Sequence, residues 1–122
     1  MIKWKRLGKS FKYAFKGLKV LWKEEQNFRI HVVVGLIIII LSLILQIKAI
    51  ELAIILIAIA IVLCLETLNT VVENMVDVLK PRFDLMVKKI KDLIAAGVLI
   101  ASILAIVIGI LILLPYLINH IA

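Results

Sequence analysis

The chain has 122 residues, of which 65% are hydrophobic, and it carries a formal charge of +7 and a mean hydropathy of +1.20. A soluble domain of this length cannot bury so much apolar surface, since ordinary globular proteins are only about 45–50% apolar. The composition therefore excludes a soluble domain and predicts an all-α membrane protein with a single domain, residues 1–122.

The basic residues are distributed unevenly along the chain. Nine precede the first long apolar run, five lie between the second and the third, and only Lys48 lies elsewhere. Because cytoplasmic segments are enriched in Lys and Arg, this pattern predicts a multi-pass protein of the cell membrane with a cytoplasmic N-terminus. We expect no nucleic-acid partner, because no soluble module accompanies the charge.

Residues 3–27 are predicted to form an amphipathic helix on the membrane surface, since basic and aromatic side chains alternate at helical spacing. The apolar face carries Trp4, Leu7, Phe11, Phe15, Leu18 and Trp22, and the basic face carries Lys9, Lys12, Lys16, Lys19 and Lys23.

Three apolar runs follow, at about residues 30–47, 52–76 and 93–118, and each is close to the roughly 20 residues that span a bilayer. A short turn is expected at residues 46–51 and a polar cytoplasmic connection at residues 77–92. Pro81 is expected to break the second helix and Pro115 to kink or end the third. Asp92 is expected at the N-terminus of the third helix, where a carboxylate is favourable.

The second run ends in four polar residues, Glu66, Asn69, Glu73 and Asp77, which we call the polar stripe. Their offsets of 0, 3, 7 and 11 place them on one narrow helical face. Ionisable groups at membrane depth are costly and usually functional, so the stripe needs a cation or a protonated partner.

Glu24 and Glu25 precede the first span at the cytoplasmic level, and Glu73 on the second span is expected about one turn inside that level. Two carboxylates from different helices suit Mg²⁺, which commonly bridges substrate phosphates. Glu66 lies deeper and suits a general base. Basic residues that can hold phosphate oxygens are Arg6, Lys88, Lys89 and Lys91. Together these residues predict phosphoryl transfer at the membrane surface.

Other interpretations stay open for these residues. Glu66 and Asn69 can fix helix packing, Asp77 can end a helix, and His31 is expected to be interfacial rather than catalytic. A small cation or proton transporter is the alternative of another class, with the carboxylates as a relay. A structural membrane subunit leaves the stripe unexplained.

The polar stripe, followed by Lys91-Asp92 and Ala95-Ala96-Gly97, resembles the small prokaryotic diacylglycerol kinase family, which includes the undecaprenol kinases of Gram-positive bacteria. The segments 13–18 (YAFKGL) and 25–29 (EQNFR) are similar too, and the likeness covers about residues 6–110. The resemblance implies a homotrimer with shared active sites that transfers the γ-phosphoryl group of ATP, with Mg²⁺, to a lipid alcohol.

The resemblance also implies a role for individual residues. Glu66 matches the general base, Asn69 its neighbour, and Glu25 and Glu73 the metal-binding carboxylates. The nucleotide-contacting pair is Lys91 and Asp92, and the surface-helix positions near nucleotide or lipid are Arg6, Tyr13, Phe15 and Lys16.

The chain departs from the family at residues 82–84, which read Arg-Phe-Asp where the family usually has Glu-Tyr-His. No nucleotide contact is carried over to these three positions. The segments 29–31 (RIH) and 13–17 (YAFKG) look more like the Gram-positive branch, so undecaprenol is the preferred acceptor and diacylglycerol the alternative.

Overall fold

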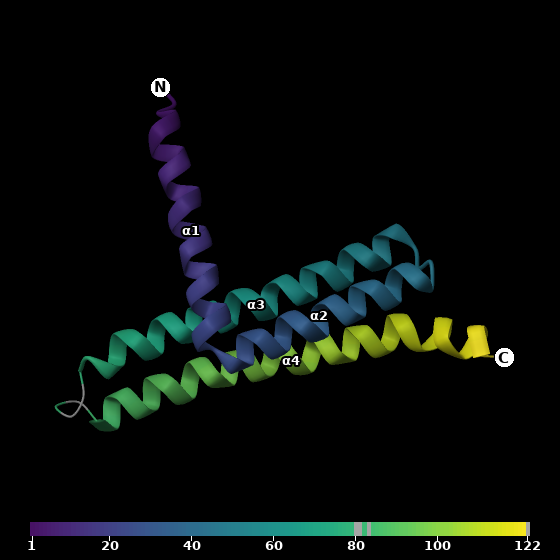
Figure 1. Ribbon diagram of the computed structural model, residues 1–122. Helices are drawn as coiled ribbons and strands as arrows, with labels where there is room; N and C mark the ends of the chain where they lie inside the picture. The colour runs from purple at the N-terminus through teal and green to yellow at the C-terminus, as the bar shows by residue number, and fades with distance from the viewer. Residues whose placement is uncertain (80–81, 83, 122) are drawn as a thin grey trace.

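The computed structural model describes residues 1–79, 82 and 84–121, and the part described contains four helices (Figure 1). They are α1 (Trp4–Glu24), α2 (Gln26–Ile44), α3 (Ala49–Asp77) and α4 (Asp84–Ile121). The last three are long and apolar enough to cross a membrane. The predicted architecture, one amphipathic helix followed by three membrane-spanning helices, is confirmed.

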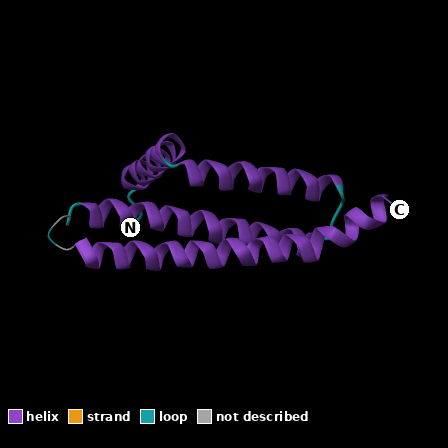
Figure 2. Cartoon of the chain, turned by 90° about the horizontal axis from the view of Figure 1, so that it is seen from below, coloured by secondary structure: helices purple, strands orange, loops and turns teal. Residues whose placement is uncertain are grey.

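The three long helices form a bundle in which α3 is the central member. It packs against α4 over most of its length and against α2, whereas α2 and α4 barely touch each other (Figure 2). The α2–α3 contact is close at Gly35, where an added Cβ would lie 3.1 Å from Cγ2 of Ile59. Glycine at this position therefore lets the two backbones approach, as small residues do between membrane helices.

α1 projects across the long axis of the bundle and meets it only at its C-terminal end (Figure 1). The helix breaks at Glu25, whose extended backbone separates α1 from α2. Arg29 on α2 secures this corner because its Nη1 donates to the carbonyls of Trp22 and Lys23, at 2.8 and 2.9 Å. A helix held in this way can lie in the membrane plane while the bundle crosses the bilayer.

The turn between α2 and α3 is shorter than the expected 46–51. Gln46 adopts a left-handed backbone with φ 54°, and the amides of Gln46 and Ile47 donate to the carbonyls of Leu43 and Ser42, which is a Schellman ending of α2. α3 then begins at Ala49, because the Glu51 side chain caps the amide of Lys48.

The third membrane helix is longer than the 93–118 predicted. It begins at Asp84, so Asp92 lies inside α4 and the expectation that Asp92 marks its N-terminus is wrong. Residues 84–92 belong to this helix, although their many charges led us to expect a polar connection there. α4 also continues through Pro115 to Ile121, and its last turns leave the axis of the rest (Figure 2). The predicted helix break at Pro81, and Phe83 of the divergent segment, lie outside the described residues.

Candidate active site

All four members of the polar stripe lie on α3, and their exposure rises along it. Glu66 is buried, Asn69 and Glu73 are partly buried, and Asp77, the last residue of the helix, is exposed. A buried carboxylate within a membrane helix needs hydrogen-bond partners, because desolvation of its charge is expensive. The side chains that contact Glu66 therefore determine what this carboxylate can do.

Glu66 has a partner on α2. The Nε2 atom of His31 lies 3.3 Å from Oε1 of Glu66, and the side chains are 27% and 5% exposed, respectively. The hydroxyl of Thr70 donates to the Glu66 carbonyl at 3.1 Å, so it is satisfied within α3. His31, which the sequence led us to expect as an interfacial side chain, instead contacts the deepest carboxylate of the site.

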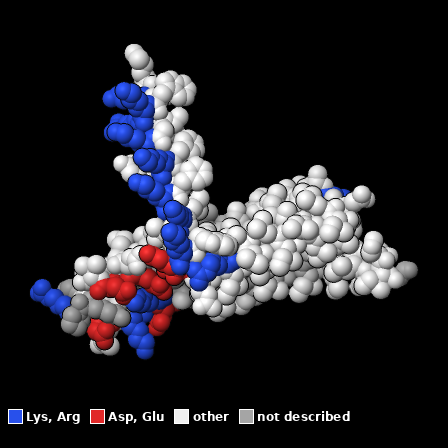
Figure 3. All heavy atoms as spheres, viewed as in Figure 1, with Lys and Arg blue, Asp and Glu red and all other residues white. Residues whose placement is uncertain are grey.

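Glu25 lies at the corner between α1 and α2, and its environment is electrostatically negative. The pKa of its carboxyl group is raised above the usual value, first by burial and then by repulsion from Glu73, Glu66 and Glu24, while Arg29 opposes the shift. Figure 3 shows the acidic side chains gathered at this end of the bundle, next to the base of α1. Glu73 is therefore near enough to Glu25 for its charge to act on that carboxyl group.

This negative charge bears on the metal prediction. Within residues 1–79, 82 and 84–121, no group of three or more His, Cys, Asp or Glu side chains is placed to hold a metal by itself. Magnesium, however, needs only one or two carboxylates when waters and substrate phosphates complete its shell. Glu25 and Glu73 fit such an incomplete site by their chemistry, because the repulsion from Glu73 that raises the pKa of Glu25 is relieved when a cation lies between the two carboxylates.

Lys91 lies on the first turns of α4 and reaches back to α3. Its Nζ atom lies 2.5 Å from Oδ1 of Asp77, whose side chain is 51% exposed. This pair gives Asp77, the stripe member of uncertain role, a contact between helices. Lys91 and the exposed Asp92 therefore lie at the same end of the bundle as the carboxylates, where Figure 3 shows acidic and basic side chains together.

The predicted residues of α1 do not join this group within one chain. Arg6, Tyr13, Phe15 and Lys16 are exposed on a helix that points away from the bundle (Figure 1). Lys16 places its ammonium 5.9 Å above the Tyr13 ring, an exposed cation–π contact. Basic and apolar side chains occupy opposite flanks of α1, as predicted (Figure 3).

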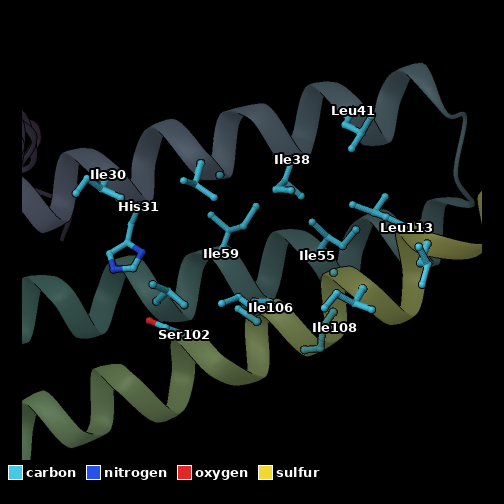
Figure 4. Close-up of a pocket in the computed structure, with 18 of the residues that line it drawn as sticks. Ile30, His31, Ile38, Leu41, Ile55, Ile59, Ser102, Ile106, Ile108 and Leu113 are labelled. Carbon is cyan, nitrogen blue, oxygen red and sulfur yellow. The ribbon is translucent and has the colours of Figure 1, made fainter. Parts of the chain in front are cut away.

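An apolar groove of about 510 Å³ runs between α2 and α4, with α3 as its floor (Figure 4). Its walls are mostly isoleucine, leucine and valine, and His31 and Ser102 are its polar side chains. Val62 on the floor lies four residues before Glu66 and on the same face of α3. The groove thus leads along the membrane-spanning part of the bundle towards the His31–Glu66 pair.

The sequence matches the family model for prokaryotic diacylglycerol kinase over residues 12–113, which is most of the chain. The chain belongs to the prokaryotic diacylglycerol kinase family. The resemblance inferred from the polar stripe is therefore confirmed, and the three apolar helices are those of a multi-pass membrane protein.

The individual relatives are named either diacylglycerol kinase or undecaprenol kinase. A diacylglycerol kinase of Synechocystis sp. is 35% identical over 111 residues, which are 90% of this chain and 63% of that protein. The undecaprenol kinase of Bacillus subtilis is 32% identical over 110 residues, 90% of this chain and 89% of that protein. A diacylglycerol kinase of Helicobacter pylori is 32% identical over 99 residues, 81% of this chain and 77% of that protein. These relatives support a lipid kinase, and thus an enzyme rather than a transporter.

Proposed function

We propose that this protein phosphorylates undecaprenol, with ATP as donor and Mg²⁺ as cofactor, to give undecaprenyl phosphate. The observation that carries the proposal is the position of Glu66: a buried carboxylate, paired with His31, beyond the end of an apolar groove. A lipid alcohol whose chain lies in the groove brings its hydroxyl to that carboxylate. Family membership supports the kinase class, and the acceptor is the finer part of the proposal.

Each residue of the site has a part in this reaction. Glu66 accepts the proton of the lipid hydroxyl while the hydroxyl oxygen attacks the γ-phosphorus. Asn69, one turn further along α3, orients the hydroxyl. Lys91 holds phosphate oxygens, with Asp92 beside it. Glu25 and Glu73 would hold Mg²⁺, which when bound neutralises charge on the phosphates.

We further propose that the enzyme is a homotrimer with active sites shared between subunits, at the cytoplasmic face. α1 presents Arg6, Tyr13, Phe15 and Lys16 away from the carboxylates of its own chain, which supports a role for them near the site of a neighbour. The clustering of basic residues at the same end of the molecule as the carboxylates supports the cytoplasmic side.

The preference for undecaprenol rests on the resemblance of segments 29–31 (RIH) and 13–17 (YAFKG) to the Gram-positive branch, and on the B. subtilis relative. Diacylglycerol is the second candidate acceptor, because the Synechocystis and H. pylori relatives bear that name. Both lipids present a primary hydroxyl, so the acceptor must be decided by assay.

The test is transfer of labelled γ-phosphate by purified protein in lipid bilayers containing undecaprenol. Glu66→Gln should lower turnover by about 10²–10⁴-fold, the usual contribution of a general base, while nucleotide binding is retained. Glu24→Gln, at an exposed residue of the same end, is the matched control and should keep its activity. Normal turnover by Glu66→Gln would show that Glu66 is not the base.

A further inference from the structure

We infer that His31 is a positioning residue for Glu66: its Nε2–H donates a hydrogen bond to Oε1 and leaves Oε2 to take the proton of the acceptor hydroxyl. This inference rests on the proposed role of Glu66 as the base. It adds a residue of α2 to a site otherwise built from α3, α4 and the α1–α2 corner.

The direction of the hydrogen bond follows from the chemistry of the pair. A carboxylate that is to act as the base can only accept hydrogen bonds, so in this inference the hydrogen is carried by the Nε2 atom that lies 3.3 Å from Oε1. Because the Glu66 side chain is only 5% exposed, water supplies little alternative solvation. A single N–H from α2 therefore compensates part of the charge and also fixes how the carboxylate is turned.

The two helices are built to keep this contact. His31 and Gly35 are one turn apart on the same face of α2, and at Gly35 the backbone of α2 lies close to Ile59 of α3. The Thr70 hydroxyl bonds to the backbone of α3 and so does not compete for the Glu66 side chain. Glu25 is a further acidic side chain near this contact, since Glu66 and Glu73 both repel its carboxylate.

His31 also occupies the boundary between two environments. It lines the apolar groove, as Figure 4 shows, and it contacts Glu66, which lies beyond the groove on the same face of α3. The other polar side chain of the groove, Ser102, is on α4. A hydroxyl at the head of an apolar chain therefore meets His31 and Glu66 together where the groove ends.

In the reaction, the acceptor oxygen forms a bond to the γ-phosphorus while the bond from that phosphorus to the β–γ bridging oxygen breaks. The hydroxyl proton passes to Oε2 of Glu66, and ADP leaves with the bridging oxygen. His31 keeps its own proton throughout. Its contribution is the orientation of Glu66, and loss of orientation in such a site lowers the rate more than it weakens binding.

The test compares His31→Leu, His31→Gln and Glu66→Gln in bilayers, with kcat and KM for undecaprenol measured for each. His31→Leu replaces the imidazole with an apolar side chain of similar volume and so removes the N–H donor. It should lower kcat about 10–100-fold with little change in KM. His31→Gln retains an N–H of similar reach and should restore most of the lost kcat. His120→Leu, the same exchange at an exposed residue of the C-terminal turn, should behave as wild type.

Coupling gives a second readout. In the Glu66→Gln background, His31→Leu should lower kcat no further, because the two residues act as a unit. The inference is overturned if His31→Leu keeps the kcat of the wild type or if His31→Gln is as slow as His31→Leu. It is also overturned if the double variant loses kcat by the product of the losses of His31→Leu and Glu66→Gln. If His31→Leu fails to fold, His31→Met, which also lacks an N–H donor, takes its place in the same comparisons. An active Glu66→Gln enzyme would instead contradict the base assignment itself.

Discussion

The contact between α2 and α3 at Gly35 offers a graded way to disturb the site without altering a reacting group. In Gly35→Ala the new Cβ would lie 3.1 Å from Cγ2 of Ile59, at least 0.3 Å inside the 3.4 Å where ordinary contact begins. Overpacking of this kind costs about 1–3 kcal/mol, and the better helix propensity of alanine returns about 1 kcal/mol. We therefore expect a net loss of about 0–2 kcal/mol in stability.

The effect on activity follows from geometry. Separation of α2 from α3 by the same 0.3 Å, one turn away at His31, would lengthen the 3.3 Å contact with Glu66 to about 3.6 Å, beyond hydrogen-bonding range. We expect kcat to fall about tenfold with KM for the acceptor nearly unchanged.

The measurement is unfolding in one detergent together with turnover in bilayers. Gly97→Ala on α4 is the matched control, because an added Cβ there meets nothing within 4 Å, and it should be less destabilised than Gly35→Ala by about 1–3 kcal/mol. In an Ile59→Ala background, Gly35→Ala should become neutral or stabilising. Equal stability of the two glycine variants, or no rescue by Ile59→Ala, would refute the reasoning.

Two further predictions concern the charged end of the bundle. The folded protein keeps the Glu25 proton to higher pH than the unfolded chain does, because the pKa of Glu25 is raised on folding. Without a cation, the free energy of unfolding should therefore fall as pH rises from about 4.5 through the raised pKa. Added Mg²⁺ should reverse this loss. Thermal unfolding against pH, with and without Mg²⁺, is the measurement. If Mg²⁺ stabilises Glu25→Gln as much as it stabilises the wild type, the prediction is contradicted. Lys91→Met should raise KM for ATP about tenfold or more by removing a charge-assisted phosphate contact, with little change in KM for lipid. An unchanged KM for ATP would remove Lys91 from the nucleotide site.

Much of the fold follows from the sequence because membrane helices have simple requirements. Each backbone group must be satisfied within its helix, so length and apolarity predicted the three spans, and the basic and aromatic pattern predicted α1. Boundaries were less predictable. α4 begins at Asp84 because charged residues at a membrane surface remain good helix formers, and the left-handed Gln46 ends α2 without the glycine that usually marks such a position.

The site was predictable in part for the same reason. Helical periodicity placed Glu66, Asn69, Glu73 and Asp77 on one face, and that pattern is local. The partner of Glu66 depends on the rotation and depth of α2 relative to α3, which no local pattern contains. A weak indication was present: a histidine at the head of an otherwise apolar span needs a polar partner.

The position of the α1 residues reflects another limit. Arg6 was grouped with the site as a basic residue that can hold phosphate, and Tyr13, Phe15 and Lys16 through the family resemblance. In a single chain, however, α1 carries all four away from Glu66. Contacts between subunits leave no simple trace in the sequence of one chain, so their part in the reaction stays a prediction.

The most direct test of the central claim is an acceptor assay with purified enzyme, ATP and Mg²⁺, in which undecaprenol and diacylglycerol are compared in the same bilayers. The account predicts phosphate transfer to both lipids or to undecaprenol alone, with the higher kcat/KM for undecaprenol, and loss of that transfer in Glu66→Gln. A higher kcat/KM for diacylglycerol would overturn the proposed acceptor. Failure with both lipids, in folded protein that binds ATP, would contradict the lipid kinase account.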